Sequence, residues 1–215
     1  MGKIWCPKKG IRCKELGDNL FLFSFLQPGG KKHAITEGPW EFGGDLLIVV
    51  DFDGSKRLKE LEFNYAPVWI RVFDLQLGMM NRVTGKVIGD KVGKTLEVET
   101  EDDGSAVGSY LRIKVRLDVR KPLLRGVTLE DEDNGDGKWC PIQYEFLPNF
   151  CYGCGLLGHV ERECDESAGK AEEQQQYGDW LRASPARRRN QGDSRGRGSS
   201  GGSLGGIRQQ QITVR

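Results

Sequence analysis

The sequence lacks several features that define familiar classes of protein. No apolar run approaches the roughly 18–20 residues needed to cross a bilayer. The longest run, residues 20–26, is typical of a buried strand. The first ten residues contain no apolar segment of the kind found in a signal peptide. These absences argue against an integral membrane protein and against export.

Cysteine is present but unevenly distributed. Three of the six cysteines, Cys151, Cys154 and Cys164, fall within fourteen residues, and the other three are scattered. An odd remainder does not fit a framework of disulfides, so we expect reduced thiols. This predicts an intracellular, reducing compartment, which is either the nucleus or the cytoplasm, with the nucleus slightly favoured.

The cysteine-rich segment CYGCGLLGHVEREC has the spacing of a metal site. It reads Cys151-x2-Cys154-x4-His159-x4-Cys164. Three thiolates and one imidazole complete a tetrahedron around zinc, with bonds of about 2.0–2.3 Å. Gly155 and Gly158 supply tight turns, and so short a segment would obtain its folding free energy from the metal. We predict one structural Zn²⁺ held by these four ligands.

The segment resembles the zinc knuckle (a CCHC-type zinc finger) of retroviral nucleocapsid and retrotransposon Gag-like proteins. The resemblance implies that the knuckle contacts single-stranded nucleic acid and that Tyr152 and Val160 form the base-contacting surface. Arg162 is the only basic residue inside the motif, among Glu161 and Glu163. A zinc ion with three thiolates already carries a charge of about −1, so tight phosphate binding by the knuckle alone is not expected.

Positive charge is instead concentrated at the end of the chain. The net charge of +1 combines +7 over residues 182–215 with −4 over residues 165–181 and −2 over residues 1–164. The sequence from residue 167 is polar and rich in glycine, which predicts a disordered tail that is basic from residue 182. Either the tail binds nucleic acid or it is a solvated linker. The candidate contacts are Arg187, Arg188, Arg189, Arg195 and Arg197.

Residues 1–148 are expected to fold as one domain, followed by the knuckle at 149–166. Apolar runs and alternating patterns predict strands and helices in mixed order. Strands are expected at 20–26, 45–52, 66–75, 95–100, 110–119 and 139–147, and helices at 31–37 and 79–92. This order favours an α+β fold, with a ferredoxin-like or RNA-recognition-like mixed sheet.

The same region resembles a domain of unknown function in plant retrotransposon-derived proteins, including Gag-like and LINE first-reading-frame products. The motifs that carry this resemblance are KIWCPKKG (3–10), ELGDNLFLFSF (15–25), GPWEFGGDLLIV (38–49), APVWIRVFDL (66–75) and PIQYEFLPNFCYGCG (141–155). The family places a further strand and helix before the first motif, so the resemblance implies an N-terminally truncated domain.

No group of residues predicts catalysis. With His159 committed to zinc, His33 is the only histidine left for acid–base chemistry, and the carboxylates are concentrated in loops. Four protein ligands also leave the metal no open position, which indicates a structural site and no enzyme activity. Arg112, Lys114 and Arg116 share one face of a strand, and either a phosphate-binding surface or a solvated sheet face fits them.

These observations predict a zinc-dependent protein that binds single-stranded RNA or DNA. The knuckle would contact bases, the basic tail would attract phosphates, and the α+β domain would act as a scaffold with a capacity for self-association. Two alternatives remain open. In one, the knuckle is a protein-interaction module that uses Leu156 and Leu157. In the other, the chain is a transposon remnant without a retained function.

Overall fold

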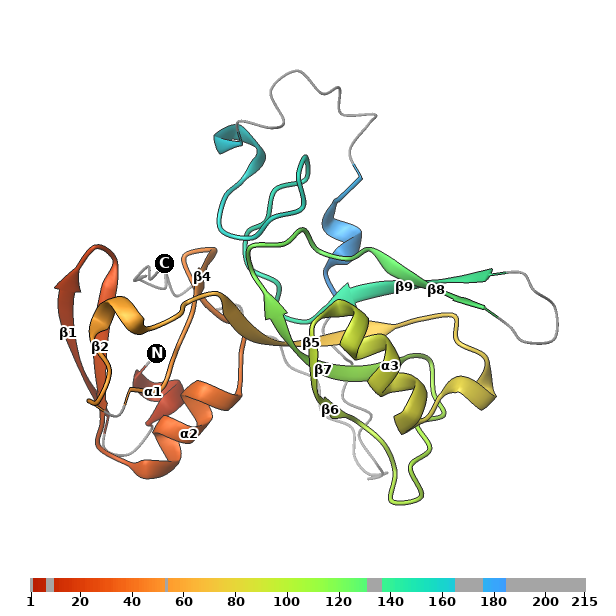
Figure 1. Ribbon diagram of the computed structural model, residues 1–215, viewed down its shortest axis with the longest axis horizontal. Helices are drawn as coiled ribbons and strands as arrows, with labels where there is room; N and C mark the ends of the chain where they lie inside the picture. Colours follow the sequence, from red (N-terminus) through yellow and green to blue (C-terminus); the bar gives the residue numbers. More distant parts are fainter. Residues whose placement is uncertain (1, 7–9, 53, 131–136, 165–175, 185–215) are drawn as a thin grey trace, which may run out of the picture.

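The computed structural model describes residues 2–6, 10–52, 54–130, 137–164 and 176–184 (Figure 1). An N-terminal part of two small hairpins and two helices lies beside a five-stranded sheet, and the zinc-knuckle segment projects above the sheet. The prediction of a mixed α+β fold is confirmed. No helix in the described part of the chain is long and apolar enough to span a membrane.

The N-terminal part is built on aromatic packing. Antiparallel hairpins pair β1 (Ile11–Gly17) with β2 (Leu20–Phe25) and β3 (Trp40–Phe42) with β4 (Asp45–Leu47). Helices α1 (Gly2–Trp5) and α2 (Pro28–Thr36) complete it. Buried Trp5 contacts the rings of Phe23, Phe25 and Trp40 at centroid distances of 5.2–5.8 Å. Asp18 and Asn19 take positive φ angles of 50° and 58° in the β1–β2 turn, a conformation that these residues tolerate best after glycine.

The larger core lies under an antiparallel sheet with the strand order β6-β7-β5-β9-β8. The strands are β5 (Tyr65–Val72), β6 (Lys94–Val98), β7 (Leu111–Asp118), β8 (Gly126–Glu130) and β9 (Gly137–Tyr144). Alternate residues of the central strands are buried, Ile70 and Ile113 among them, and α3 (Arg82–Val92) packs on this face. Gly85 and Gly89 bring α3 close to the sheet, because a Cβ there would collide with Val98 or Thr95.

The sequence patterns located most of these elements. The expected strand at 45–52 is wrong beyond Leu47, because its partner β3 is only three residues long and the chain then leaves the hairpin. Ile48 is nevertheless buried. Strands β1, β3 and β8 were not anticipated. A ferredoxin-like unit would also place a second helix between β7 and β9, whereas residues 119–125 are not helical and β8 follows them.

Part of the expected disordered tail folds back onto the sheet. Residues 176–184, which we call the strap, contain a 3-10 turn at Asp179–Leu181 (η5) and run beside the end of β9 (Figure 1). Leu181 is fully buried, and the Ala183 N–H donates to the Tyr144 carbonyl at 2.9 Å. Arg71 donates to the Ser184 carbonyl at 2.8 Å. The prediction of disorder from residue 167 is therefore wrong for the strap.

Candidate metal centre

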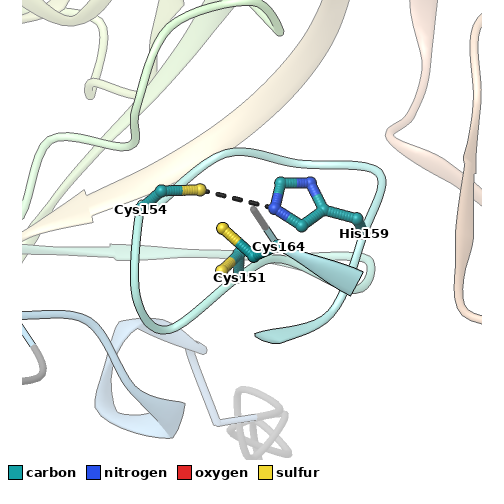
Figure 2. A group of neighbouring side chains, drawn as sticks. All are labelled: Cys151, Cys154, His159 and Cys164. Carbon is teal, nitrogen blue, oxygen red and sulfur yellow. Dashed lines mark hydrogen bonds between the residues drawn. The ribbon is translucent and has the colours of Figure 1, made fainter. Parts of the chain in front are cut away.

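The four predicted zinc ligands lie together (Figure 2). The ligand atoms of Cys151, Cys154, His159 and Cys164 are all within 4.8 Å of one another. The Cys154 Sγ lies 3.4 Å from the His159 Nε2, so this nitrogen faces the centre of the group. In a zinc tetrahedron with bonds of about 2.0–2.3 Å, neighbouring ligand atoms are about 3.6–3.8 Å apart. The group therefore needs little adjustment to hold one ion.

The backbone around the ligands explains how so short a segment brings them together. The Gly155 N–H donates to the Cys151 carbonyl at 2.8 Å, and the Cys151 N–H donates to the Leu156 carbonyl at 2.9 Å. These bonds close a tight loop around the first two cysteines. Gly155 and Gly158 have φ angles of +77° and +92°, which side-chain-bearing residues rarely adopt. A 3-10 turn at Glu161–Glu163 (η3) then returns the chain to Cys164.

The chemistry of the donor set fits zinc. Burial, with further contributions from hydrogen bonds to Cys151 and Cys164, raises the pKa of the Cys154 thiol to about 12. A cation at the centre reverses this effect, because zinc binds thiolates and releases their protons. Since four protein ligands complete the coordination sphere, the residues form a structural centre for one Zn²⁺.

The metal centre is joined to the sheet domain. Phe150 is buried in the same core as the five-stranded sheet, and Leu157 packs against that core. Cys151 is also fully buried. The Leu123 N–H, from the loop after β7, donates to the Gly155 carbonyl at 2.9 Å. On the other side, the Asn149 N–H donates to the Gly44 carbonyl at 2.7 Å. Folding of the knuckle is therefore coupled to packing of the domain.

The strap covers one face of the knuckle. The Tyr152 hydroxyl donates to Asp179 Oδ1 at 3.0 Å, and burial together with this carboxylate raises the pKa of Tyr152. The Tyr152 ring packs against Phe150 with centroids 5.0 Å apart. The Tyr177 ring lies so close to Gly155 that a Cβ there would collide with it. The residue expected to contact bases is thus engaged with the protein's own chain.

The other residues predicted to contact nucleic acid or a protein partner differ in where the structure places them. Val160 and Arg162 are exposed at the knuckle surface. The five candidate arginines of the tail, from Arg187 to Arg197, lie outside the described residues. Leu156 and Leu157 are both partly buried, so they do not form the exposed apolar surface that a protein-interaction module was expected to use.

The basic face of β7 is largely occupied by ion pairs. Lys114 is buried and donates to Glu37 at 2.7 Å, and Arg112 pairs with Glu99 and Glu145. Arg112 also lies over the Trp69 ring at 3.9 Å from its centroid. Arg116 is exposed and lies over the Tyr65 ring at 4.4 Å. This face is therefore neither a free phosphate-binding surface nor a fully solvated one, because Arg112 and Lys114 are held in ion pairs within the protein.

The fold and the metal centre define an α+β protein with a CCHC-type zinc knuckle. Comparison with known families agrees, since residues 117–166 match a family described as a zinc knuckle. The matched stretch begins before β8 and includes the β8–β9 hairpin as well as the four ligands. No curated protein and no solved structure matches the chain.

Two glycines of the knuckle give a matched pair of variants. Gly155→Ala is expected to cost about 2–4 kcal/mol of unfolding free energy, because it combines a left-handed backbone with the collision against Tyr177. Gly158→Ala carries only the backbone cost of about 1–2 kcal/mol, since no atom lies within 4 Å of the added carbon. Chemical denaturation of the zinc-loaded variants measures the loss of unfolding free energy in each. Equal losses for Gly155→Ala and Gly158→Ala would contradict the contact between Tyr177 of the strap and the knuckle.

Proposed function

We propose that this protein binds single-stranded nucleic acid and that zinc is needed to build the binding surface. The observation that carries the proposal is the closed group of three cysteines and one histidine within a stretch that matches the zinc-knuckle family. Zinc knuckles commonly bind nucleic acids, and the resemblance to retroelement proteins points to the same class of ligand. An origin in a retrotransposon is part of this proposal.

The role of the zinc in this proposal is structural. Four protein ligands leave no coordination position for a water molecule or a substrate, so we infer that the protein is not an enzyme. The ion fixes the knuckle, and the knuckle in turn contacts the strap and the loop after β7 through Tyr152 and Gly155. Zinc therefore holds three segments of the binding region in register.

Phosphate attraction is assigned to basic segments on either side of the knuckle. Residues 119–125, which lie against the knuckle through Leu123, contain three cations, of which Arg120 and Lys121 lie beside Asp118. Residues 182–215 contain eight arginines and one aspartate. These segments offset the negative charge around η3 and supply the salt-dependent part of the affinity.

We also infer that the sheet is a shortened relative of the ferredoxin-like unit. In β6-β7-β5-β9 the strand that follows α3 is separated from β5 by β7, as in a split βαβ arrangement, and β8 takes the place of the second helix. RNA-recognition domains bind bases on the open face of such a sheet. Here Arg71, Arg112 and Lys114 on that face are paired with carboxylates, so the sheet is assigned the role of a scaffold.

A salt titration of oligonucleotide binding, with and without zinc, tests the proposal. The zinc-loaded chain should bind a fluorescent single strand more tightly than the matching duplex, and a strong chelator should abolish the difference. Replacing Arg187, Arg188 and Arg189 by alanine should reduce the slope of log K against log salt by about 2, because each phosphate contact to a single strand contributes about 0.7. Equal binding by the zinc-loaded and zinc-free chains would rule the proposal out.

A second candidate is a protein-interaction module. The observation that favours it is the acidic character of the knuckle, where Glu161 and Glu163 flank the single base Arg162. This candidate predicts no affinity for oligonucleotides at low salt. The same titration therefore separates the two functions.

A further inference from the structure

We propose that Phe146 and Trp180 form the base-stacking surface of this protein, in place of Tyr152. The inference rests on the proposed function and names the residues that would contact unpaired bases. Stacking on aromatic side chains is the usual source of sequence-tolerant affinity for single strands. Such a surface needs aromatic rings near the knuckle that are accessible to solvent and held in place.

Tyr152 does not meet these conditions. Its hydroxyl is bonded to Asp179, its ring packs against Phe150, and it is only partly exposed. Freeing Tyr152 from this bond would require the strap to move away. The strap is anchored by the buried Leu181 and by the backbone bond from Ala183 to Tyr144, so that movement would break part of the main core.

Phe146 is held in an exposed position by the residues on either side of it. Its φ angle is +52°, a conformation that costs a bulky residue free energy, and 77% of its surface is exposed. Tyr144, Glu145 and Leu147 are all buried. The backbone therefore turns sharply at this point and presents the phenyl ring to solvent immediately before the knuckle. A left-handed backbone and an exposed apolar ring at the same position indicate a binding role.

Trp180 is presented in the same way by the strap. Its surface is 49% exposed, although the next residue, Leu181, is fully buried. The preceding residue, Asp179, is bonded to both Tyr152 and Arg182. The indole is thus accessible while the backbone that carries it is fixed on both sides.

Arg182 connects the two aromatic positions. Its guanidinium donates to the carbonyl oxygens of Leu147 and Pro148, the first of which is adjacent to Phe146. Arg182 itself is two residues after Trp180, and it pairs with Tyr144 in a short parallel bridge. Phe146 is thus one residue from Leu147, and Trp180 is two residues from Arg182. The Arg182 side chain therefore holds together the two segments that carry these rings.

Basic residues lie in the loop before β8, beside β9, which favours a nucleic acid over an apolar protein partner. Arg125 is exposed, and its carbonyl accepts from Ile142, two residues before Tyr144 on β9. Lys121, in the same loop, has a side chain that is 77% exposed, with its ammonium group 4.0 Å from Asp118. The arginine-rich part of the chain begins directly after the strap. Two fixed aromatic rings bordered by cations are the arrangement expected for stacked bases with neighbouring phosphates.

Fluorescence anisotropy with a labelled single-stranded oligonucleotide tests the assignment on the zinc-loaded full chain. Phe146→Ala and Trp180→Ala should each weaken binding about five- to a hundredfold. Phe146→Tyr and Trp180→Phe, which keep an aromatic ring, should stay within about threefold of the wild type. Trp139→Ala is the matched control, because Trp139 is also 49% exposed but lies on β9 five residues before Tyr144, about 17 Å along the strand.

Zinc content and thermal unfolding of each variant show whether a loss of binding reflects a loss of structure. Ultraviolet cross-linking to a uridine-containing strand should also label the peptides that contain Phe146 and Trp180. If the alanine variants bind like the wild type, or if Trp139→Ala is equally impaired, the assignment is wrong while the proposed function stands. If the wild type binds no oligonucleotide, or these residues mediate only self-association, both the function and the assignment fail.

Discussion

Replacing Cys154 by serine is expected to release the zinc and destabilise the whole domain, not only the knuckle. The reason is that Phe150 lies in the main hydrophobic core and the neighbouring ligand Cys151 is fully buried, so a knuckle that opens exposes part of that core. Zinc present at a thousandfold excess over its Kd contributes about 4 kcal/mol to the unfolding free energy. In a protein of this size, such a loss lowers Tm by about 8–16 °C.

Thermal unfolding and zinc stoichiometry, measured together, check this prediction. Cys13→Ser is the control, because Cys13 is an exposed thiol on β1 and is not among the ligands. It should keep one zinc per chain and the wild-type Tm. A chelator should lower the Tm of the wild type to that of Cys154→Ser and leave the variant unchanged. A variant that lost its zinc but kept its Tm would show that the knuckle folds independently of the domain.

The metal centre could be predicted from the sequence because its ligands are local. Cys151, Cys154, His159 and Cys164 lie within fourteen residues, and the chain between them is too short to place them far apart. The role of Tyr152 could not be predicted in the same way. Its hydrogen-bond partner, Asp179, lies 27 positions along the chain, beyond a polar segment without any periodic pattern.

The strands show the same difference between features set by local sequence and features set by distant partners. Strand β7 alternates apolar and charged residues, and strand β5 alternates aliphatic residues with bulkier ones such as Trp69 and Arg71, so their positions follow from the pattern. Strand β1 is mostly exposed and polar, and it is a strand because it pairs with the apolar β2. Whether such a segment forms a strand depends on its pairing partner, and the local sequence of β1 does not predict that partner.

The strap shows how a few residues can order a segment of disorder-prone composition. Tyr177, Trp180 and Leu181 are apolar residues within a polar stretch, and this cluster was the available signal. What composition cannot show is that Leu181 is buried in the main core or that Arg71 reaches the Ser184 carbonyl, 113 positions away in sequence. These contacts hold residues 181–184 against β9 and β5.

A second large effect is expected from Glu145→Gln, which removes the charge at the centre of a buried ion-pair network. The carboxylate accepts from Arg71 Nε at 2.6 Å and from Arg112 Nε and Nη2 at 2.9 and 2.8 Å. The Arg71 and Glu145 side chains are both buried. An amide cannot neutralise two guanidinium groups, so the variant leaves buried positive charge without its partner. Breaking a buried pair in this way costs about 3–5 kcal/mol.

Chemical denaturation of zinc-loaded Glu145→Gln measures this cost, and Glu60→Gln is its control. Glu60 also pairs with an arginine, Arg57, but the pair is exposed to solvent, so its loss should leave stability almost unchanged. A similar stability for the wild type and Glu145→Gln would show that the network contributes little.

The pH dependence gives an independent check on the charge of Glu145. Burial opposes ionisation of this carboxyl, but the hydrogen bonds and charges of Arg112 and Arg71 outweigh it and lower the pKa below the ordinary value of 4.5. A lowered pKa means that the stabilisation is complete above about pH 4.5 and is lost as the pH falls through the lowered value. The difference in unfolding free energy between the wild type and Glu145→Gln should therefore be constant near neutral pH and shrink in acid. Because both proteins lose zinc in acid, the difference isolates the carboxylate from the metal, and a gap that widened as the pH fell would contradict the assigned ion pairs.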